Sequence, residues 1–367
     1  MKIALLTSSR ADYGIYLPLL KALKNDPFFD LNIVAFGTHL SKKYGATINQ
    51  IFNDGFEVAF QIDTMPDGEN PADISFAMGK TLKNFSKIWT ENSFDLIIAL
   101  GDRYEMFAAC ASVISFGVPI AHIHGGEKTL GAIDDIFRHC ITQMATYHFT
   151  IAEVYKQRVI EIKGGHDNVY DVGALSIDNL KAMELLSVDE FKIRYGIDLY
   201  LPSILITFHP ETVDFENNQY YIEQLIEALE DLPKYQFIIT MPNTDTMGNI
   251  IREKIKEFVA KNENAVGIES FGVLGYLSCM KHCTMMLGNT SSGFVEASFF
   301  PKYVINLGER QSGRLLTANI NNCKIEKEEI LAAVKQYHAW PLNKMKSIYG
   351  QGNSAVIIRD ILKSNFN

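Results

Sequence analysis

The sequence predicts an α/β protein with two similar halves, each built on a parallel, doubly wound sheet. The first observation is the length, because 367 residues are enough for two domains that each bury a core. The second is that short apolar strands alternate with helical patterns, which is typical of parallel sheets covered by helices. The third is that this alternation restarts after about residue 174, where Gly173 marks the crossover.

In the first half, β-branched and leucine-rich runs predict the strands, and amphipathic runs between them predict the helices. The predicted strands cover residues 2–9, 29–40, 56–62, 94–102, 118–124 and 147–152, and the apolar run 113–123 reads as a buried strand entered through a glycine and a proline. The predicted helices cover residues 15–25, 41–55, 71–92 and 133–145.

The second half repeats this order with the same kinds of segment. Its predicted strands cover residues 202–210, 235–243, 265–271, 284–292 and 302–311. Its predicted helices cover residues 220–232, 249–262, 273–283 and 294–300, and an amphipathic helix follows at 353–366. Ligands of such sheets bind at the carboxyl ends of the strands, so functional residues are expected there.

The composition is that of a soluble globular protein, with 47% apolar and 21% charged residues. A net charge of -9 argues against a general nucleic-acid-binding protein, which normally presents a basic face. The apolar run at the N-terminus is too short for a secretory signal, and no apolar run is long enough to span a membrane. We therefore expect a cytoplasmic protein without membrane or nucleic-acid partners.

The five cysteines are scattered along the chain, which predicts buried, reduced thiols. Cys279 and Cys283 have His282 between them, so a zinc site is the alternative. No second pair of ligands accompanies them, and this favours structural thiols.

The stretch 101–139 concentrates acids, histidines and arginines. Asp102 and Arg103 lie at the carboxyl end of a predicted strand, where active sites of α/β proteins form. In HIHGGE, the alternation of an extended segment places His122 and His124 on one side. The two glycines that follow allow a tight turn.

Asp134 falls on the helix after this turn. Its side chain either takes part in acid–base chemistry or forms an i,i+4 ion pair with Arg138. A metal site made of His122, His124 and Asp134 is a further alternative, although their spacing does not enforce it. The cluster therefore favours acid–base work or substrate orientation.

SSRADYG follows the first strand and opens the first helix, where backbone N–H groups and the helix dipole favour an anion. The GxGxxG fingerprint of nicotinamide-dinucleotide sites is absent. Arg10 in this turn either reaches a diphosphate or pairs with Asp12 at the surface, and its position alone does not decide between them.

A second phosphate motif is GNTSSGFVEA at 288–297, a strand followed by hydroxyl residues and a helix. Thr290, Ser291 and Ser292 either donate to phosphate oxygens or form an ordinary N-cap cluster. Glu296 either accepts ribose hydroxyls or compensates the helix dipole.

TFHPET at 207–212 places His209 between a strand and a proline. A histidine there donates to a phosphate or takes part in proton transfer. The alternative is a capping or core histidine.

Seven motifs occur in order along nearly the whole chain. They are SRADYG, LGDRYE, HIHGGEKT, the DDxxRH segment at 134–139, FHPET, GNTSSG with its glutamate, and NLGERQSGR. Together they resemble the hydrolysing UDP-N-acetylglucosamine 2-epimerases of bacterial sialic-acid biosynthesis, a branch of the UDP-GlcNAc 2-epimerase family. Each motif is weak alone, but the ordered series is specific.

The resemblance implies a GT-B-like fold, with two Rossmann-like domains, parallel sheets and an inter-domain cleft. The domains would be 1–174, joined by the C-terminal helix at about 352–367, and 175–351. The implied reaction converts UDP-GlcNAc and water to N-acetylmannosamine and UDP, with no metal, nicotinamide or other cofactor. The family also implies a homo-oligomer, a dimer or a tetramer.

Carried onto this sequence, the family's catalytic residues are Asp102, His124 and Asp134, with His209 close to the phosphates. The implied UDP contacts are Arg10, Arg103, His209, Asn243, Phe271 beside the uracil, Thr290, Ser291, Ser292, Glu296 and Arg310. Many relatives have Glu in the place of His124, so the identity of the base stays open. Asp134 and His124 are assigned to the two faces of the sugar, and Asp102 orients or relays.

Other functions remain open at this point. The same reaction on UDP-N,N'-diacetylbacillosamine, which feeds legionaminic acid, differs only in the sugar pocket. A GT-B glycosyltransferase would transfer the sugar to an acceptor, and a non-hydrolysing epimerase would return UDP-N-acetylmannosamine. A UDP-sugar-binding regulator would bind the nucleotide without turnover.

Overall fold

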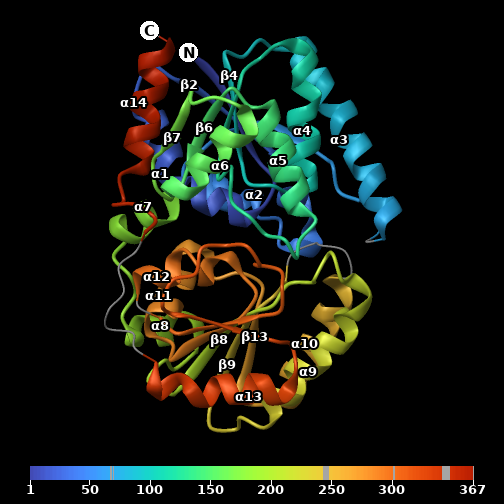
Figure 1. Cartoon of the computed structure of the whole chain (residues 1–367), viewed down its shortest axis with the longest axis vertical. Helices are drawn as coiled ribbons and strands as arrows, with labels where there is room; N and C mark the ends of the chain where they lie inside the picture. Colours follow the sequence, from blue (N-terminus) through green and yellow to red (C-terminus); the bar gives the residue numbers. More distant parts are fainter. Residues whose placement is uncertain (67, 69, 243–247, 301, 341–347, 367) are drawn as a thin grey trace. The chain divides into compact units, whose positions relative to one another are not determined.

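The computed structural model describes residues 1–66, 68, 70–242, 248–300, 302–340 and 348–366. Within them the chain forms two parallel sheets with helices packed on them (Figure 1). The two Rossmann-like halves predicted from the sequence are therefore confirmed. Unit 1 comprises Met1–Glu127, Asp134–Ala182 and Ile348–Asn367, and unit 2 comprises Lys128–Ile133 and Met183–Ser347.

Unit 1 contains a seven-stranded sheet in the order β3-β2-β1-β4-β5-β6-β7. Its strands are β1 (Lys2–Thr7), β2 (Asp30–Phe36), β3 (Val58–Ile62), β4 (Leu96–Leu100), β5 (Ile120–Ile123), β6 (Tyr147–Thr150) and β7 (Val169–Asp171). The helices α3 (Pro71–Glu91), α4 (Tyr104–Val113), α5 (Asp134–Met144) and α6 (Glu153–Lys163) pack in sequence as one layer. The helices α1 (Arg10–Lys24), α7 (Leu175–Ala182) and α14 (Ser354–Phe366) pack together in another, and α2 (Ile48–Asn53) lies between β2 and β3 in the chain.

Residues 113–116 are helical, so the interpretation of the apolar run 113–123 as one buried strand is wrong in its first part. Val113 ends α4, and Ile114–Phe116 forms a 3-10 turn that Gly117 closes with a φ of +71°. The apolar run therefore belongs to two elements, which hydrophobicity alone does not separate. The helices α4 and α6 and the strand β7 were not predicted.

Unit 2 contains a six-stranded sheet in the order β10-β9-β8-β11-β12-β13. Its strands are β8 (Ser203–Thr207), β9 (Gln236–Thr240), β10 (Ala265–Ile268), β11 (Met285–Gly288), β12 (Val304–Leu307) and β13 (Ile320–Cys323). Its helices are α8 (Val188–Tyr195), α9 (Asn218–Glu230), α10 (Gly248–Lys261), α11 (Gly272–His282), α12 (Glu296–Phe299) and α13 (Lys327–Gln336).

Each face of the unit 2 sheet has its own core. Along β8, Ile204 and Ile206 join the apolar cluster under α9, α10 and α13. Leu205 points the other way, into the cluster under α8 and α11. Since both faces are buried, the strands are continuously apolar, which is why they were found from the sequence. The edge strand β13 carries Asn321 and Asn322, residues that are depleted in strands, and it was missed together with α8 and α13.

The compact units extend unit 1 beyond the predicted boundary at residue 174. Helix α7 belongs to unit 1 because it packs against α1 and α14. Asp178 of α7 accepts hydrogen bonds from the backbone N–H groups of Ser354 (3.1 Å) and Ala355 (2.8 Å), which caps α14. Figure 1 shows α14, in red, beside α1 and α7.

Residues 128–133 are assigned to unit 2, although both flanking segments belong to unit 1. The backbone N–H of Leu130 donates to the carbonyl of Ser312 at 2.8 Å, and that of Ile133 donates to Thr212 Oγ1 at 2.9 Å. A Cβ atom on Gly131 would lie 2.1 Å from the carbonyl oxygen of Glu309, so only glycine fits there.

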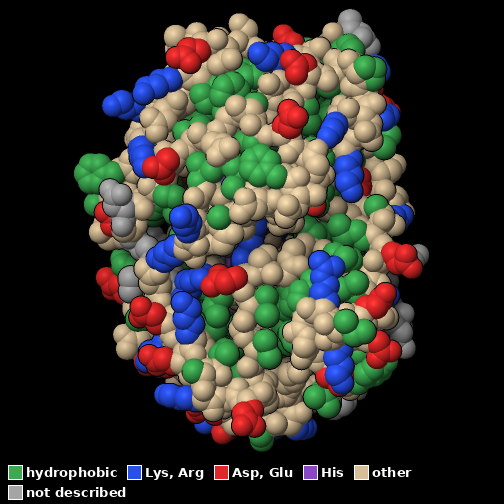
Figure 2. Space-filling model, turned by 180° about the vertical axis from the view of Figure 1, so that it is seen from behind, with side chains coloured by type: hydrophobic (Ala, Val, Ile, Leu, Met, Phe, Trp, Pro, Cys, Tyr) green, Lys and Arg blue, Asp and Glu red, His purple; other side chains and the backbone are tan. Residues whose placement is uncertain are grey.

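Among the described residues, no helix has both the length and the apolar character needed to cross a membrane. On the face drawn in Figure 2, acidic and basic side chains are interspersed. The cysteines are free thiols, and all except Cys140 are buried.

Candidate active site

The strand order reverses between β1 and β4 in unit 1, and between β8 and β11 in unit 2. Doubly wound sheets bind ligands at the carboxyl ends of the strands beside such a switch point. Predicted site residues follow all four of these strands. They are Arg10 after β1, Asp102 and Arg103 after β4, His209 after β8, and Thr290, Ser291 and Ser292 after β11.

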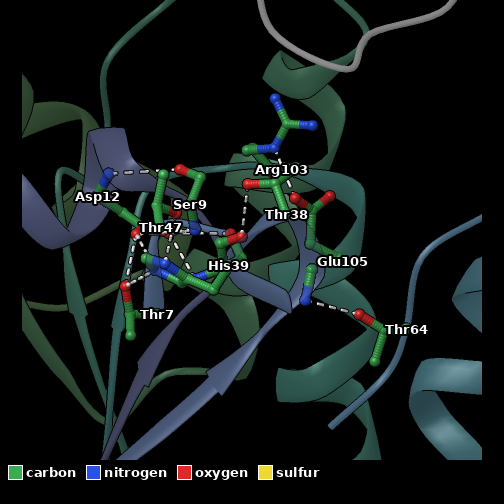
Figure 3. Close-up of polar contacts among 11 residues, drawn as sticks. Thr7, Ser9, Asp12, Thr38, His39, Thr47, Thr64, Arg103 and Glu105 are labelled. Carbon is green, nitrogen blue, oxygen red and sulfur yellow. Dashed lines mark hydrogen bonds and ion pairs between the residues drawn. The ribbon is translucent and has the colours of Figure 1, made fainter. Parts of the chain in front are cut away.

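The turn after β1 is organised by the buried carboxylate of Asp12 (Figure 3). It accepts hydrogen bonds from Thr7 Oγ1 (2.6 Å) and from the backbone N–H groups of Ser8 (2.8 Å) and Ser9 (3.1 Å). His39 Nε2 lies 3.0 Å from Thr7 Oγ1, and burial lowers the pKa of this histidine. Asp12 is therefore no surface residue, and it shapes the helix start that carries Arg10.

Arg138 holds the segments around the exit of β4 together. Its buried guanidinium forms an ion pair with Asp102 and donates to Asp135 Oδ1 at 3.2 Å. It also donates to the backbone carbonyl of Glu127 at 3.0 Å. A single cation thus fixes Asp102 against the first turn of α5, where Asp134 lies largely buried at the positive end of the helix.

Arg103 pairs with Glu105 in α4, with 2.6 Å between Nε and Oε1. Glu105 is buried, whereas the side chain of Arg103 keeps 15% of its surface exposed.

His122 and His124 do not share one side of a strand, so that prediction is wrong. β5 ends at Ile123, and the left-handed φ of +69° at His124 breaks the alternation. His122 Nε2 lies 2.8 Å from the carbonyl of Gly101, and Nδ1 lies 3.2 Å from Thr142 Oγ1. Both ring nitrogens are engaged, and burial lowers the pKa of His122 to about 4, so this residue is a neutral core histidine rather than a metal ligand.

His124 pairs with a residue that was not among the predicted site residues. Its Nδ1 lies 2.6 Å from Oε1 of Glu127, whose side chain is 2% exposed. The spacing of three residues across two glycines was the available signal. A tight turn of that kind returns the chain to the histidine.

In unit 2, Asn289 connects three loops at the switch point. Its side chain forms hydrogen bonds with the backbone N–H and the backbone carbonyl of His209. The backbone carbonyl of Asn289 accepts a hydrogen bond from Gln311 Nε2 at 2.9 Å. His209 is itself 9% exposed. Asn289 therefore joins the loops that follow β8, β11 and β12 by hydrogen bonds.

A chain of hydroxyl groups supports the serine-rich turn. Thr290 caps the turn and lies 3.1 Å from Ser292 through the two hydroxyl oxygens. Ser292 Oγ lies 2.6 Å from the hydroxyl of Tyr276, which lies 3.5 Å from Thr207 Oγ1. Burial raises the pKa of Tyr276 to about 12, so its hydroxyl stays protonated.

Arg310 lies against the buried carboxyl group of Glu211. Its backbone N–H donates to Glu211 Oε1 at 3.2 Å, and its Nη1 donates to the carbonyl of Pro210 at 2.9 Å. Burial raises the pKa of Glu211 to about 7, while the charge of Arg310 acts in the opposite direction. Gly308 has a φ of +69°, and a Cβ there would lie 2.6 Å from Glu211 Oε1, so the loop requires glycine.

The remaining predicted residues are less central to these clusters. Phe271 packs its ring against Phe191 and Tyr195, at centroid distances of 5.5 and 4.9 Å, and is 6% exposed. Glu296 begins the short helix α12 behind the serine-rich turn. Asn243 lies outside the described residues.

The two switch points offer different chemistry. Unit 1 brings together carboxylates and a histidine, groups that move protons, and arginines that pair with the carboxylates. Unit 2 brings together hydroxyls, a histidine and an arginine, donors suited to phosphate oxygens.

Comparisons with known proteins identify relatives of this chain. Residues 21–363 match the sequence model of a family described as UDP-N-acetylglucosamine 2-epimerase. The chain is 31% identical to a UDP-N,N'-diacetylbacillosamine 2-epimerase (hydrolyzing) of Legionella pneumophila, over 99% of this chain and 96% of the relative. It is 32% identical to the polysialic acid biosynthesis protein P7 of Escherichia coli, over 99% of this chain and 95% of the relative.

Among solved structures, the chain is similar to a UDP-GlcNAc 2-epimerase from Neisseria meningitidis bound to UDP-GlcNAc. The TM-score is 0.83, the sequences are 17% identical, and the match covers 100% of both chains. At this identity the similarity establishes the fold.

Proposed function

The chain belongs to the UDP-N-acetylglucosamine 2-epimerase family, and we propose that it is a hydrolysing member acting on UDP-N-acetylglucosamine. The products are N-acetylmannosamine and UDP. The observation that carries this proposal is that acid–base groups follow β4 and β5, whereas groups that can donate to phosphate follow β8 and β11. The relative named for polysialic acid biosynthesis supports a role in sialic-acid supply.

The first step is an elimination. A base removes the C2 proton of the sugar as the C1–O bond to UDP breaks, and the electron pair leaves with the diphosphate. The product is 2-acetamidoglucal. Since the C2 proton is weakly acidic, cleavage of the C1–O bond must be well advanced, so stabilisation of the leaving diphosphate is decisive. Arg10, Arg103, His209 and Arg310 supply that charge, and the hydroxyls of Thr290, Ser291 and Ser292 donate to the phosphate oxygens.

The second step is a hydration. Water adds to C1 and a proton returns to C2 on the opposite face, which inverts that carbon. One group is therefore needed on each face of the sugar. His124 and Asp134 take these roles, and Asp102, held by Arg138, orients the sugar or relays a proton.

Deuterated water tests both steps at once. With UDP-GlcNAc as the sole substrate, we expect free N-acetylmannosamine labelled at C2, together with UDP. Recovery of labelled UDP-N-acetylmannosamine would indicate a non-hydrolysing epimerase. An unlabelled, intact donor would exclude both and favour a glycosyltransferase or a binding protein.

Two variants test the assignment of residues. Asp134→Asn and His124→Ala should each lower kcat by about 100-fold or more, the usual size of a lost acid–base group. Asp189→Asn is the matched control, because Asp189 lies in the first turn of α8 as Asp134 does in α5, but is exposed. Folded variants with normal turnover would show that the assignment is wrong.

A second substrate is favoured by the relatives of Legionella pneumophila and Campylobacter jejuni that are named for N,N'-diacetylbacillosamine 2-epimerases. Parallel assays with the two UDP-sugars decide between them by the ratio of kcat/KM. The predicted domain boundaries, homo-oligomeric state, cytoplasmic location and independence of cofactors stay predictions.

A further inference from the structure

His124 occupies a position that stability alone does not explain. Its φ of +69° lies in the left-handed region, which is unfavourable for a non-glycine residue because Cβ comes close to the following carbonyl oxygen. Among the described residues, its Nε2 is buried and has no hydrogen-bond partner. Leaving such an atom unsatisfied is unfavourable, because it has given up its hydrogen bonds to water without a replacement. A strained backbone and an unsatisfied side-chain nitrogen in one residue are typical of a functional residue.

The backbone conformation of this histidine is nevertheless well held. Its N–H donates to the carbonyl of Phe149 at 3.1 Å, next to the end of β5. The turn that follows packs closely, since a Cβ on Gly126 would lie 2.3 Å from the carbonyl oxygen of Tyr155. The chain turns at the two glycines, and Glu127 lies beside His124.

Two arginines fix the returning segment. Arg158 Nη1 donates to the carbonyl of Gly126 at 2.6 Å, and Arg138 Nη1 donates to the carbonyl of Glu127 at 3.0 Å. These hydrogen bonds anchor the backbone that holds the carboxylate of Glu127 2.6 Å from His124 Nδ1. Glu127 contacts Nδ1, the ring nitrogen other than Nε2, and is almost fully buried.

We propose that Glu127 is a positioning residue that sets the tautomer of His124, so that Nε2 is the atom exchanging a proton with the substrate. An ionised carboxylate only accepts hydrogen bonds, so Nδ1 must carry the hydrogen. In the neutral ring, Nε2 then holds the lone pair and accepts the proton from C2 or, once protonated, returns one. A buried carboxylate orients a catalytic imidazole by the same physical logic in serine proteases.

The inference rests on the proposed function only for the identity of the substrate. The tautomer itself is a property of the free protein and can be measured without turnover. This separates a failure of the inference from a failure of the proposed function.

Imidazole nitrogen NMR on the full chain gives the first readout, with the His124 signals assigned from their loss in His124→Asn. We expect the Nδ1–H tautomer in the wild type. Glu127→Gln should shift His124 toward the Nε2–H tautomer, because the amide can donate as well as accept. Glu153→Gln, an exposed glutamate in unit 1, should leave these signals unchanged. A wild-type His124 in the Nε2–H form would overturn the proposal, even if the enzyme is active.

The kinetic readout separates positioning from substrate binding. Glu127→Gln should lower kcat by about 10- to 100-fold with KM changed less than about twofold, the usual scale for groups that orient a reacting residue. Glu127→Ala should lose more, since it also removes the acceptor oxygen. Wild-type kcat in Glu127→Ala, or a loss confined to KM, would refute the proposal. If the wild-type protein turns over neither UDP-sugar, the proposed function fails and the tautomer measurement still decides the role of Glu127.

Discussion

The side chain of Asn289 pairs with the backbone of His209 in both directions. The N–H of His209 donates to Asn289 Oδ1 at 2.7 Å, and Asn289 Nδ2 donates to the carbonyl of His209 at 2.9 Å. Asn289 is completely buried. Because Asn289 follows β11 and His209 follows β8, this pair locks the two sides of the unit 2 switch point to each other.

Replacement of Asn289 by alanine should therefore loosen the predicted phosphate site and weaken the fold. The buried N–H and carbonyl of His209 would lose their partners, at about 1–3 kcal/mol for each group. We expect a lower free energy of unfolding in urea and at least tenfold weaker binding of UDP by calorimetry. Asn319→Ala is the control, because Asn319 is equally buried but bonds to Lys302. Equal losses of UDP affinity in the two variants would contradict a special role for Asn289.

Removal of one hydroxyl should affect the serine-rich turn selectively. Tyr276→Phe takes away the partner of Ser292 at 2.6 Å and should cost about 1 kcal/mol of stability. UDP affinity should fall several-fold, because Ser292 then loses the shorter of the two hydroxyl contacts that orient it. Tyr303→Phe removes a buried hydroxyl that bonds to the carbonyl of Ala333, and should reduce stability without changing UDP affinity. Unchanged UDP binding in Tyr276→Phe would argue against the hydroxyl chain.

Glu211 should make stability fall as the pH rises through about 7. Its pKa is raised to about 7 by burial, so between the unfolded-state and folded-state pKa values the native protein binds more protons than the unfolded chain. The stabilisation is fully present below the unfolded pKa and is lost as the pH rises. Relative to Glu211→Gln, the wild type should lose about 1 kcal/mol between about pH 6 and pH 8 in urea titrations. A constant difference between the two proteins would mean that Glu211 stays ionised.

The paired histidines of β5 and β6 should act in the opposite direction. His122 and His148 are register partners, and burial lowers their pKa values to about 4 and about 3. Below the pKa of histidine in the unfolded chain, the unfolded chain binds protons that the native state does not bind. The free energy of unfolding therefore falls as the pH falls toward 4. The slope should be about 1.4 kcal/mol for each pH unit and histidine. His148→Phe should show a shallower slope, and a parallel slope would contradict the assignment.

Much of this fold was predictable because the strands are buried on both faces. Runs such as ILIT in β8 and LIIAL in β4 have no polar face, and the residues after them fall at the carboxyl ends where ligands bind. The predicted residues Asp102 and His209 needed nothing beyond that rule.

The contacts that organise the site were not predictable in the same way. Glu127 and Asn289 stand beside predicted residues, yet their partners depend on a left-handed backbone at His124 and on the pairing of β8 with β11. Propensity and periodicity do not reveal such tertiary choices. The helix α4 was missed for a related reason, since its apolar residues run without a break into the turn before β5.

The position of α14 has a consequence for the order in which the protein matures on the ribosome. Residues 354–366 follow the whole of unit 2 in the chain, yet they cover α1 and receive their cap from Asp178. The surface of α1 that packs against α14 therefore lacks this partner while the roughly 170 residues between Ala182 and Ser354 are synthesised. Domains usually complete their packing in the order of synthesis. Here unit 1, which is synthesised first, can complete its packing only after unit 2 has been synthesised.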